Sequence, residues 1–239
     1  MFLALVLTGC ADPPDSLAKR VARFPNVSAQ PTFGLEQADL FYPDWFLGDW
    51  QVHAILERVE APLGVEFTNP ASFARTQQQQ GQAVSYFVRF FRDEQGRVIA
   101  DRVFNTIAIA QAYLERGTVV DVQSAPGQPN RQTIFLSGNR RGDLYITRRH
   151  SEESSPHGFD TLEFYRQILA GLRQAPITKD IETTTLYRQT GAQQFTATQM
   201  TAVFLVPTDE RYFQSNGHPV TVYRYRLDFT RAPVGRGSH

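Results

Sequence analysis

The chain has little cysteine, little lysine, no net charge and no long hydrophobic run. Its 239 residues include one cysteine, Cys10, so an intrachain disulfide is excluded. Lysine is confined to Lys19 and Lys179, and arginine supplies almost all of the positive charge. The 24 basic and 24 acidic residues cancel, which argues against nucleic acid as a partner because phosphate binding requires a basic surplus. The apolar run at residues 1–7 is too short to cross a bilayer.

What is present predicts a folded, mostly β domain. Hydrophobic residues make up 41% and aromatic residues 12%, enough to build a core. Strand-sized runs separated by turn residues predict nine or ten antiparallel strands in a barrel or a sandwich. These runs are 51–59, 83–92, 97–103, 118–123, 131–136, 143–149, 161–169, 181–188, 194–206 and 219–231. The run at 161–169 also has a helical opening, and we favour the strand.

Helical spacing predicts two helices outside the sheet. One covers residues 16–24, and the other covers 105–116 with Asn105 as its N-cap and Gly117 as its C-cap. We expect a short extended piece at 63–67 and loops at 77–80 and 151–158.

The tripeptide Gly48-Asp49-Trp50 opens the first long strand, and Arg231 ends the apolar face of the last one. A guanidinium over the Trp50 ring gains about 0.5–2 kcal/mol; a shifted register would put Arg226 there instead. This combination resembles the lipocalin signature, in which the Gly allows a close approach, the Trp forms the barrel floor and the Arg packs over it. The resemblance implies an antiparallel up-and-down β-barrel of calycin type with one or two peripheral helices. The alternative is an ordinary core Trp in a sandwich.

Three longer motifs resemble an uncharacterised lipocalin-like family of cyanobacteria and chloroplast lumens. They are FYPDWFLGDW at 41–50, ETTTLY at 182–187 and VPTD at 206–209. The resemblance spans about residues 40–231 and implies a thylakoid or periplasmic location, with no known activity.

The segment Leu7-Thr8-Gly9-Cys10 follows the apolar run and resembles a bacterial lipobox, whose cysteine carries diacylglycerol. The resemblance implies an exported protein that is lipid-anchored at the periplasmic or thylakoid-lumen face of a membrane. The alternative is a poorly ordered N-terminus with an incidental cysteine. The expected organisation is a signal-peptide remnant and lipobox (1–10), a tether and docking segment (11–40), a barrel domain (41–232) and an artificial tail (233–239).

No catalytic or metal-binding pattern emerges, and we expect neither an enzyme nor a cofactor. The histidines lack metal-ligand spacing; they are His53, His150, His157 and His218. Ser154, Ser155, His157 and Asp160 lie close in sequence, but no nucleophile elbow is present. The arginines at 140–141 and 148–149 bracket a predicted hairpin, where they form either a basic patch or, more simply, a solvated strand surface.

The function expected from these observations is binding of an apolar or amphipathic small molecule, a lipid or pigment, inside the barrel. Six residues on two strand faces would line the lumen: Tyr86, Val88, Phe90, Tyr223, Tyr225 and Leu227. The rival is an accessory or assembly factor that docks on a membrane complex, such as a photosynthetic one. An open lumen favours the ligand, and a filled barrel with an exposed aromatic patch favours the partner.

Overall fold

The computed structural model describes residues 16–27, 29–32, 34, 39–124, 127–171 and 175–233. Cys10, the expected lipidation site, lies outside them. Ten strands form one antiparallel sheet in the order β3-β2-β1-β10-β9-β8-β7-β6-β5-β4. They are β1 Gly48–Glu60, β2 Ala83–Arg92, β3 Val98–Ala100, β4 Val119–Ser124, β5 Arg131–Leu136, β6 Arg140–Ser155, β7 Gly158–Ala170, β8 Ile177–Gly191, β9 Gln194–Phe204 and β10 Thr221–Arg231. The helices are α1 Leu17–Ala22, η1 Asp44–Phe46, η2 Val65–Phe67, α2 Pro70–Gln78, α3 Arg102–Tyr113 and α4 Tyr212–Ser215.

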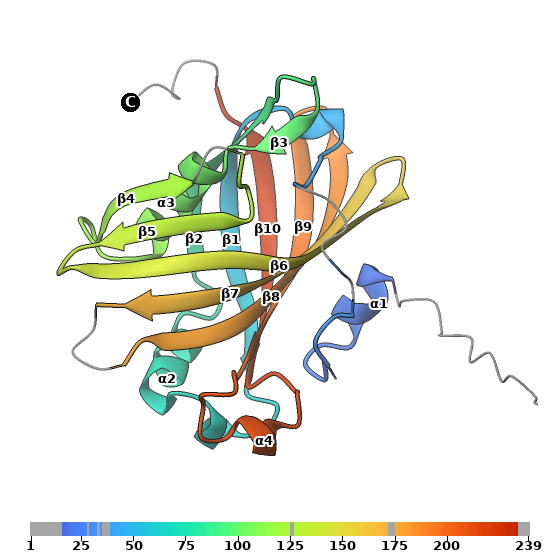
Figure 1. Cartoon of the computed structure of the whole chain (residues 1–239). Coiled ribbons are helices and arrows are strands. Elements are labelled where there is room, and N and C mark those ends of the chain that lie inside the picture. Colours follow the sequence, from blue (N-terminus) through green and yellow to red (C-terminus); the bar gives the residue numbers. More distant parts are fainter. Residues whose placement is uncertain are drawn as a thin grey trace, which may run out of the picture.

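The sheet is an up-and-down arrangement that curls into a half-barrel, which confirms the predicted all-β antiparallel class (Figure 1). Strands that are neighbours in sequence pair with each other, except β3 and β4, which lie at opposite edges of the sheet; β1 pairs with β10 as well as with β2. Twist accumulates across adjacent strands, so a sheet this wide curls on itself. Register shifts interrupt β1 between Leu56 and Arg58 and β6 between Ile146 and Arg148. Such bulges bend strands further.

The seam between the two edge strands is occupied by α3. Within the described chain, β3 and β4 are the outer members of the sheet, and α3 packs against both β2 and β4. The side chain of Asn105 accepts from Arg89 N (2.7 Å) and donates to Arg89 O (3.1 Å), so it hydrogen-bonds the backbone edge of β2. Helix α3 therefore completes the wall where strand pairing stops.

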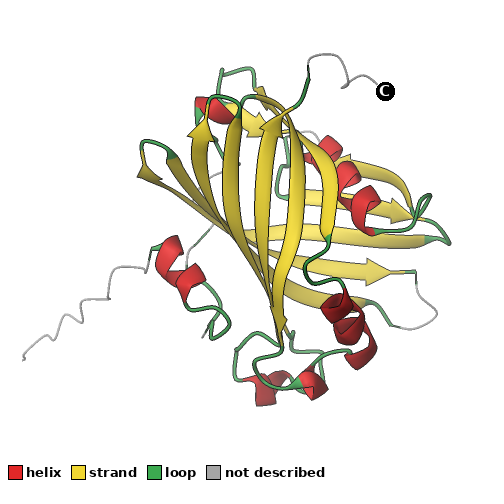
Figure 2. Cartoon of the chain, turned by 180° about the vertical axis from the view of Figure 1, so that it is seen from behind, coloured by secondary structure: helices red, strands yellow, loops and turns green. Residues whose placement is uncertain are grey.

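Two hydrophobic cores lie on opposite faces of the sheet. The inner core fills one end of the half-barrel around Phe46 of η1 and Trp50 of β1. The outer core lies between the convex face of β7–β10 and the N-terminal segment, and includes Leu17 and Val21 of α1. Figure 2 shows this helix outside the sheet, well separated from α3. The segment 11–40 was predicted to contain a docking portion, and its described part has this position.

The end of the half-barrel opposite the inner core carries α2, η2 and α4 (Figure 1). A cavity at this end is lined in part by residues of η2, α2 and the segment before α4. We refer to this end as the mouth. None of the described helices combines the length and apolarity that a membrane-crossing helix needs.

Several local predictions were wrong. Residues 65–67 form η2 rather than an extended piece, and α2 takes in residues 77–78 of the predicted loop, starting at Pro70 behind an Asn69 cap. Helix α3 begins at Arg102, capped by Asp101, and its C-cap is Leu114 rather than Gly117. Strand β6 continues to residue 155, through most of the predicted loop, because it pairs with β7 along this length.

Candidate functional site

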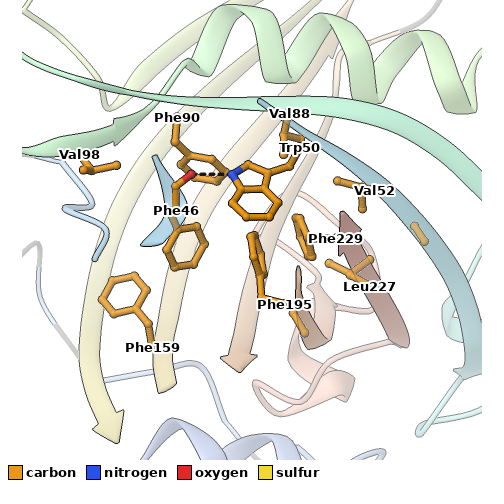
Figure 3. Packing of buried hydrophobic residues seen from close by; sticks show 12 residues of the cluster. Phe46, Trp50, Val52, Val88, Phe90, Val98, Phe159, Phe195, Leu227 and Phe229 are labelled. Atoms are coloured by element: carbon orange, nitrogen blue, oxygen red, sulfur yellow. Dashed lines mark hydrogen bonds between the residues drawn. The ribbon is translucent and has the colours of Figure 1, made fainter. Parts of the chain in front are cut away.

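The inner core closes one end of the half-barrel. Trp50 is 1% exposed, and its indole Nε1 donates to Phe46 O at 2.6 Å (Figure 3). Its ring meets Phe195 edge-on with centroids 4.6 Å apart, and Phe195 stacks on Phe229 at 4.1 Å. Aromatic contacts at these spacings are favourable. The aromatic rings pack against one another, so this end is a solid floor.

Gly48 and Arg231 complete the floor. In the register of β1 and β10, Trp50 lies opposite Arg231, whose Cζ is 4.4 Å from the centroid of the indole ring. The Arg231 guanidinium also donates to Leu47 O. Gly48 has φ +116°, and a Cβ there would collide with Arg231 Nη1. The structure thus brings together the three residues chosen from the sequence, and Arg226 lies elsewhere, opposite Ile55.

The six residues predicted to line the lumen share the inner face, but at different depths. Val88, Phe90 and Leu227 are buried in the floor. Tyr86 and Tyr225 pack against the floor and are half-buried. Tyr223, next along the same face, is half-buried and lies nearer the mouth.

On β9, beyond the floor, the concave face is more accessible than the convex face. Alternate residues of a strand face opposite ways, so Gln199 and Thr201 share the face of Ala197, which lies in the floor. Both are half-buried. Met200 and Ala202, which face outward, are 0% exposed because the N-terminal segment covers them. The inner face of β9 beyond the floor therefore keeps accessible surface, whereas Thr185 of β8 on the same face is buried.

Two cavities meet at Tyr223. One, of about 330 Å³, lies inside the wall formed by β1, β2, β10, α2 and α3, and its lining includes Ala54, Leu56, Val84 and Tyr225. The other, of about 580 Å³, lies at the mouth, with Lys179 and Phe73 among its lining residues. A salt bridge of 2.7 Å joins Lys179 Nζ to Asp209 Oδ1 across the mouth.

The tyrosines of the inner face are desolvated yet retain accessible surface. Burial raises the pKa of Tyr86, Tyr223 and Tyr225 above the ordinary value for a phenol. All three are half-buried. Tyr223 and Tyr225 line the cavity of about 330 Å³, and Tyr86 lies beside Tyr113, another of its lining residues, so the three phenols belong to one wall of the lumen.

An ion cluster lies on the opposite wall. Glu163 of β7 bonds Arg149 of β6 (2.9 Å) and Arg102 of α3 (3.1 Å), and Arg102 also pairs with Asp39. Burial acts to raise the pKa of Glu163, but the two guanidiniums outweigh it and hold that pKa below its usual range. The cluster has two positive and two negative groups, so it carries no net charge.

Sequence reasoning missed this polar wall. Arg149 was placed in a basic patch or on a solvated strand surface, whereas it is 0% exposed and faces Glu163. The predicted hairpin between the arginine pairs is instead the continuous strand β6. A bulge between Ile146 and Arg148 shifts the parity of β6, so period-2 alternation counted from the residues before the bulge assigns Arg149 to the wrong face.

The residues weighed for catalysis do not come together. Asp160 is fully buried and paired with Arg188, whereas His157 Nδ1 contacts Gln189 Oε1 at 3.1 Å. Within the part of the chain that the structure describes, no group of three or more His, Cys, Asp or Glu side chains is placed to hold a metal ion.

Comparison of the chain with protein families gave one match. A family model described as a domain of unknown function (DUF6816) matches residues 34–233, which takes in the floor, the lumen and all ten strands. Comparisons with curated proteins and with solved structures gave no significant match. Because the family model covers most of its length, this chain belongs to the DUF6816 family.

Proposed function

We propose that this protein binds a small amphipathic molecule, a lipid or a pigment, in the lumen of its half-barrel and catalyses no reaction. The observation that carries the proposal is the cavity beyond a solid aromatic floor, where the inner faces of β9 and β10 keep accessible surface. A floor at one end and a mouth at the other is also the arrangement of lipocalin-like carriers, and Gly48, Trp50 and Arg231 support that relationship.

The size and chemistry of the cavity suit such a ligand. A volume of about 330 Å³ falls within the range of small-molecule sites. Ala54, Leu56 and Val84 offer apolar surface, whereas the hydroxyls of Tyr223 and Tyr225 offer hydrogen bonds. A molecule with both apolar and polar parts matches both kinds of lining.

The test is binding of Nile red, a neutral apolar fluorophore, to the purified protein. We expect about one site per chain and a higher unfolding midpoint with the dye, because only the folded half-barrel offers the site. Val84→Trp should fill the cavity and abolish binding. The matched control is Ser85→Trp, which adds the same ring to the outer face of β2 and should bind normally. No binding to the wild type, or equal loss in both variants, would contradict the proposal.

We further propose that the protein is exported and anchored through a lipid on Cys10, at the periplasmic or thylakoid-lumen side of a membrane. The support is the lipobox-like segment at residues 7–10. Expressed with its natural signal in a bacterial host, the protein should partition into detergent, and Cys10→Ser should remove that behaviour. Equal partitioning of the two forms would exclude the anchor.

A second candidate function is that of an accessory or assembly factor for a membrane complex. The observation that favours it is apolar surface on the outside of the fold: Phe87 and Phe91 of β2 are 39% and 41% exposed. Failure of the wild type to bind Nile red in the lumen would favour this role, and binding at the lumen would favour the carrier.

A further inference from the structure

The strand register aligns the polar residues of the lumen in two rows across the sheet. In the first, Tyr225 of β10 lies opposite Gln199 of β9, which lies opposite Thr185 of β8. In the second, one step nearer the mouth, Tyr223 lies opposite Thr201, which lies opposite Thr183. We call these the polar rows; on β7 they continue to Thr161 and Glu163.

The polar rows lie between apolar surroundings. Toward the floor the next row is Leu227, Ala197 and Tyr187, all part of or packed against the inner core. Toward the mouth, the next row includes Val203 and Ile181. A polar belt in this position is not required to hold the strands together, because backbone bonds do that. It is therefore a candidate for recognising a ligand.

Gln199, at the centre of the first row, has hydrogen-bonding capacity to spare. Its amide contacts Thr185 Oγ1 and Thr201 Oγ1, both at 3.5 Å, the outer limit of a hydrogen bond. A carboxamide can form up to four bonds, and Gln199 is half-buried on the accessible inner face. A ligand donor or acceptor in the lumen would meet a side chain whose hydrogen bonds to described side chains are these two weak ones.

The wall beside these groups is aromatic. The rings of Tyr223 and Tyr225 are nearly parallel, 21° apart with centroids at 6.3 Å. Tyr86 and Tyr113 form a second pair at 6.3 Å. Ring faces favour a flat ring as their neighbour. An alkyl chain would gain less from these faces and would leave the polar rows without partners when it excluded water.

We infer that the lumen is built for a neutral ring-containing ligand that bears a hydrogen-bonding group, which lies against the tyrosine wall and bonds the polar rows at Gln199. This inference rests on the proposed ligand-binding function and narrows it. Neutrality follows from the ion cluster, in which Arg102 and Arg149 are already matched by Glu163 and Asp39.

The test compares three probes: 2-naphthol, 2-methylnaphthalene and 1-decanol. The two naphthalenes have nearly the same shape and differ in a hydroxyl against a methyl group. With dissociation constants from isothermal titration calorimetry, we expect wild type to prefer 2-naphthol over 2-methylnaphthalene by about tenfold, the ratio that one net hydrogen bond supplies. We expect 1-decanol to bind more weakly than 2-naphthol.

Substitutions test whether the polar rows cause the preference for 2-naphthol. Gln199→Leu should reduce the ratio between the two naphthalenes to about one, and the nearly isosteric Thr201→Val should reduce it in part. The control, Gln51→Leu, makes the same change on the outer face of β1 and should keep the wild-type ratio. Should Gln199→Leu fail to fold, Thr201→Val alone decides, and an unchanged ratio in it overturns the inference.

The outcomes separate the inference from the function on which it rests. If none of the three probes binds the wild type, the proposed ligand-binding function fails. If the two naphthalenes bind equally, or 1-decanol binds best, the lumen is a site for apolar chains and the inference is overturned, while the function stands. If both Gln199→Leu and Thr201→Val keep the preference for 2-naphthol, the polar rows do not bind the hydroxyl of the ligand, and the inference is overturned.

Discussion

At the scale of single residues, Trp50 joins three separate parts of the chain. Its indole bonds the backbone of η1, its ring packs on Phe195 of β9, and Arg231 of β10 covers its face. Gly48 is coupled to this arrangement, because a Cβ at residue 48 would collide with the Arg231 guanidinium. This coupling explains why a short tripeptide and a distant arginine identified the floor.

Trp50→Ala should lower the free energy of unfolding by about 3–5 kcal/mol, as large aromatic truncations in cores do. Arg231→Met should cost about 0.5–2 kcal/mol from the lost cation–π contact, with more from the lost bond to Leu47 O. Urea denaturation measures both. Arg226→Met is the control on the same strand, since Arg226 faces outward and is exposed. A cost for Arg226→Met equal to that of Arg231→Met would show that the floor contact contributes nothing.

Glu163 holds two arginines inside the lumen, and its removal should be costly. Glu163→Gln leaves Arg102 and Arg149 without their shared carboxylate, and breaking a buried ion pair costs about 3–5 kcal/mol. Glu94→Gln, in an exposed turn, should change stability little. Denaturation at pH 7 measures the difference between the two.

The pH dependence has a defined sign. The pKa of Glu163 is lower in the folded chain than the value of about 4.3 for an unfolded glutamate. Its stabilisation is therefore complete above about pH 4.3 and is lost as the pH falls toward the folded pKa, because the unfolded chain takes up the proton first. In this acid range, wild type should lose stability more steeply than Glu163→Gln. Identical slopes would mean that Glu163 is not ionised in the fold.

At the scale of elements, α3 covers the seam between the two edge strands of the sheet, β3 and β4, which do not pair with each other. All of its described side chains are half-buried or exposed, and none is fully buried. Asn105 ties its first turn to the edge of β2, and Thr106 Oγ1 donates to Gln132 Oε1 of β5 at 3.2 Å. Ile109 and Tyr113, further along, are 39% and 44% exposed. The helix is thus held mainly at its N-terminal end.

Asn105→Ala should loosen this seam. Two hydrogen bonds to the Arg89 backbone are lost, each with a net value of about 0.5–1.5 kcal/mol. Amide hydrogen exchange should accelerate at Arg89 and along α3, with less change in β7–β9. Gln111→Ala, on the exposed face of the same helix, serves as the reference. Uniform acceleration across the sheet would show that Asn105 supports the whole fold rather than the seam.

The elements also show how far sequence patterns reach. Strands with clear alternation, such as 83–92 and 131–136, were predicted with their observed bounds. The helix at 70–78 was missed because its polar composition carries little periodicity, although Asn69 and Pro70 are a recognisable start signal. Strand β6 was cut short because residues 151–155 are polar, and only pairing with β7 makes them extended.

At the scale of the whole molecule, the N-terminal segment determines which face of the sheet is free. Arg20 bonds Glu182 of β8 through both carboxylate oxygens at 2.6 and 2.5 Å, and Glu182 is 0% exposed. Leu17 and Val21 cover Met200 and Ala202 beside this pair. With the convex side of β8 and β9 covered, the concave side is left for a ligand.

Arg20→Leu should weaken the packing of the N-terminal segment on the convex face of β8 and β9. It leaves Glu182 buried without its partner, at a cost of about 3–5 kcal/mol. The melting temperature should fall, and limited proteolysis should cleave the N-terminal segment faster. Lys19→Leu removes the neighbouring exposed charge and should change neither. Equal proteolysis rates for wild type and Arg20→Leu would mean that the salt bridge does not hold the segment in place.

The sequence by itself determined most of the strands, because these depend on local alternation. Gly48, Trp50 and Arg231 indicated the floor and, through the lipocalin resemblance, the up-and-down order, because these residues have few alternative roles. Only the tertiary structure decided which polar residues face the lumen. Period-2 alternation separates Gln199 from Met200 but does not say which of them faces inward, and the expectation that apolar residues point to the barrel interior fails here. The N-terminal segment supplies a second core on the outside, so Met200 and Ala202 of β9 face outward, and Gln199 and Thr201 face the inside of the half-barrel.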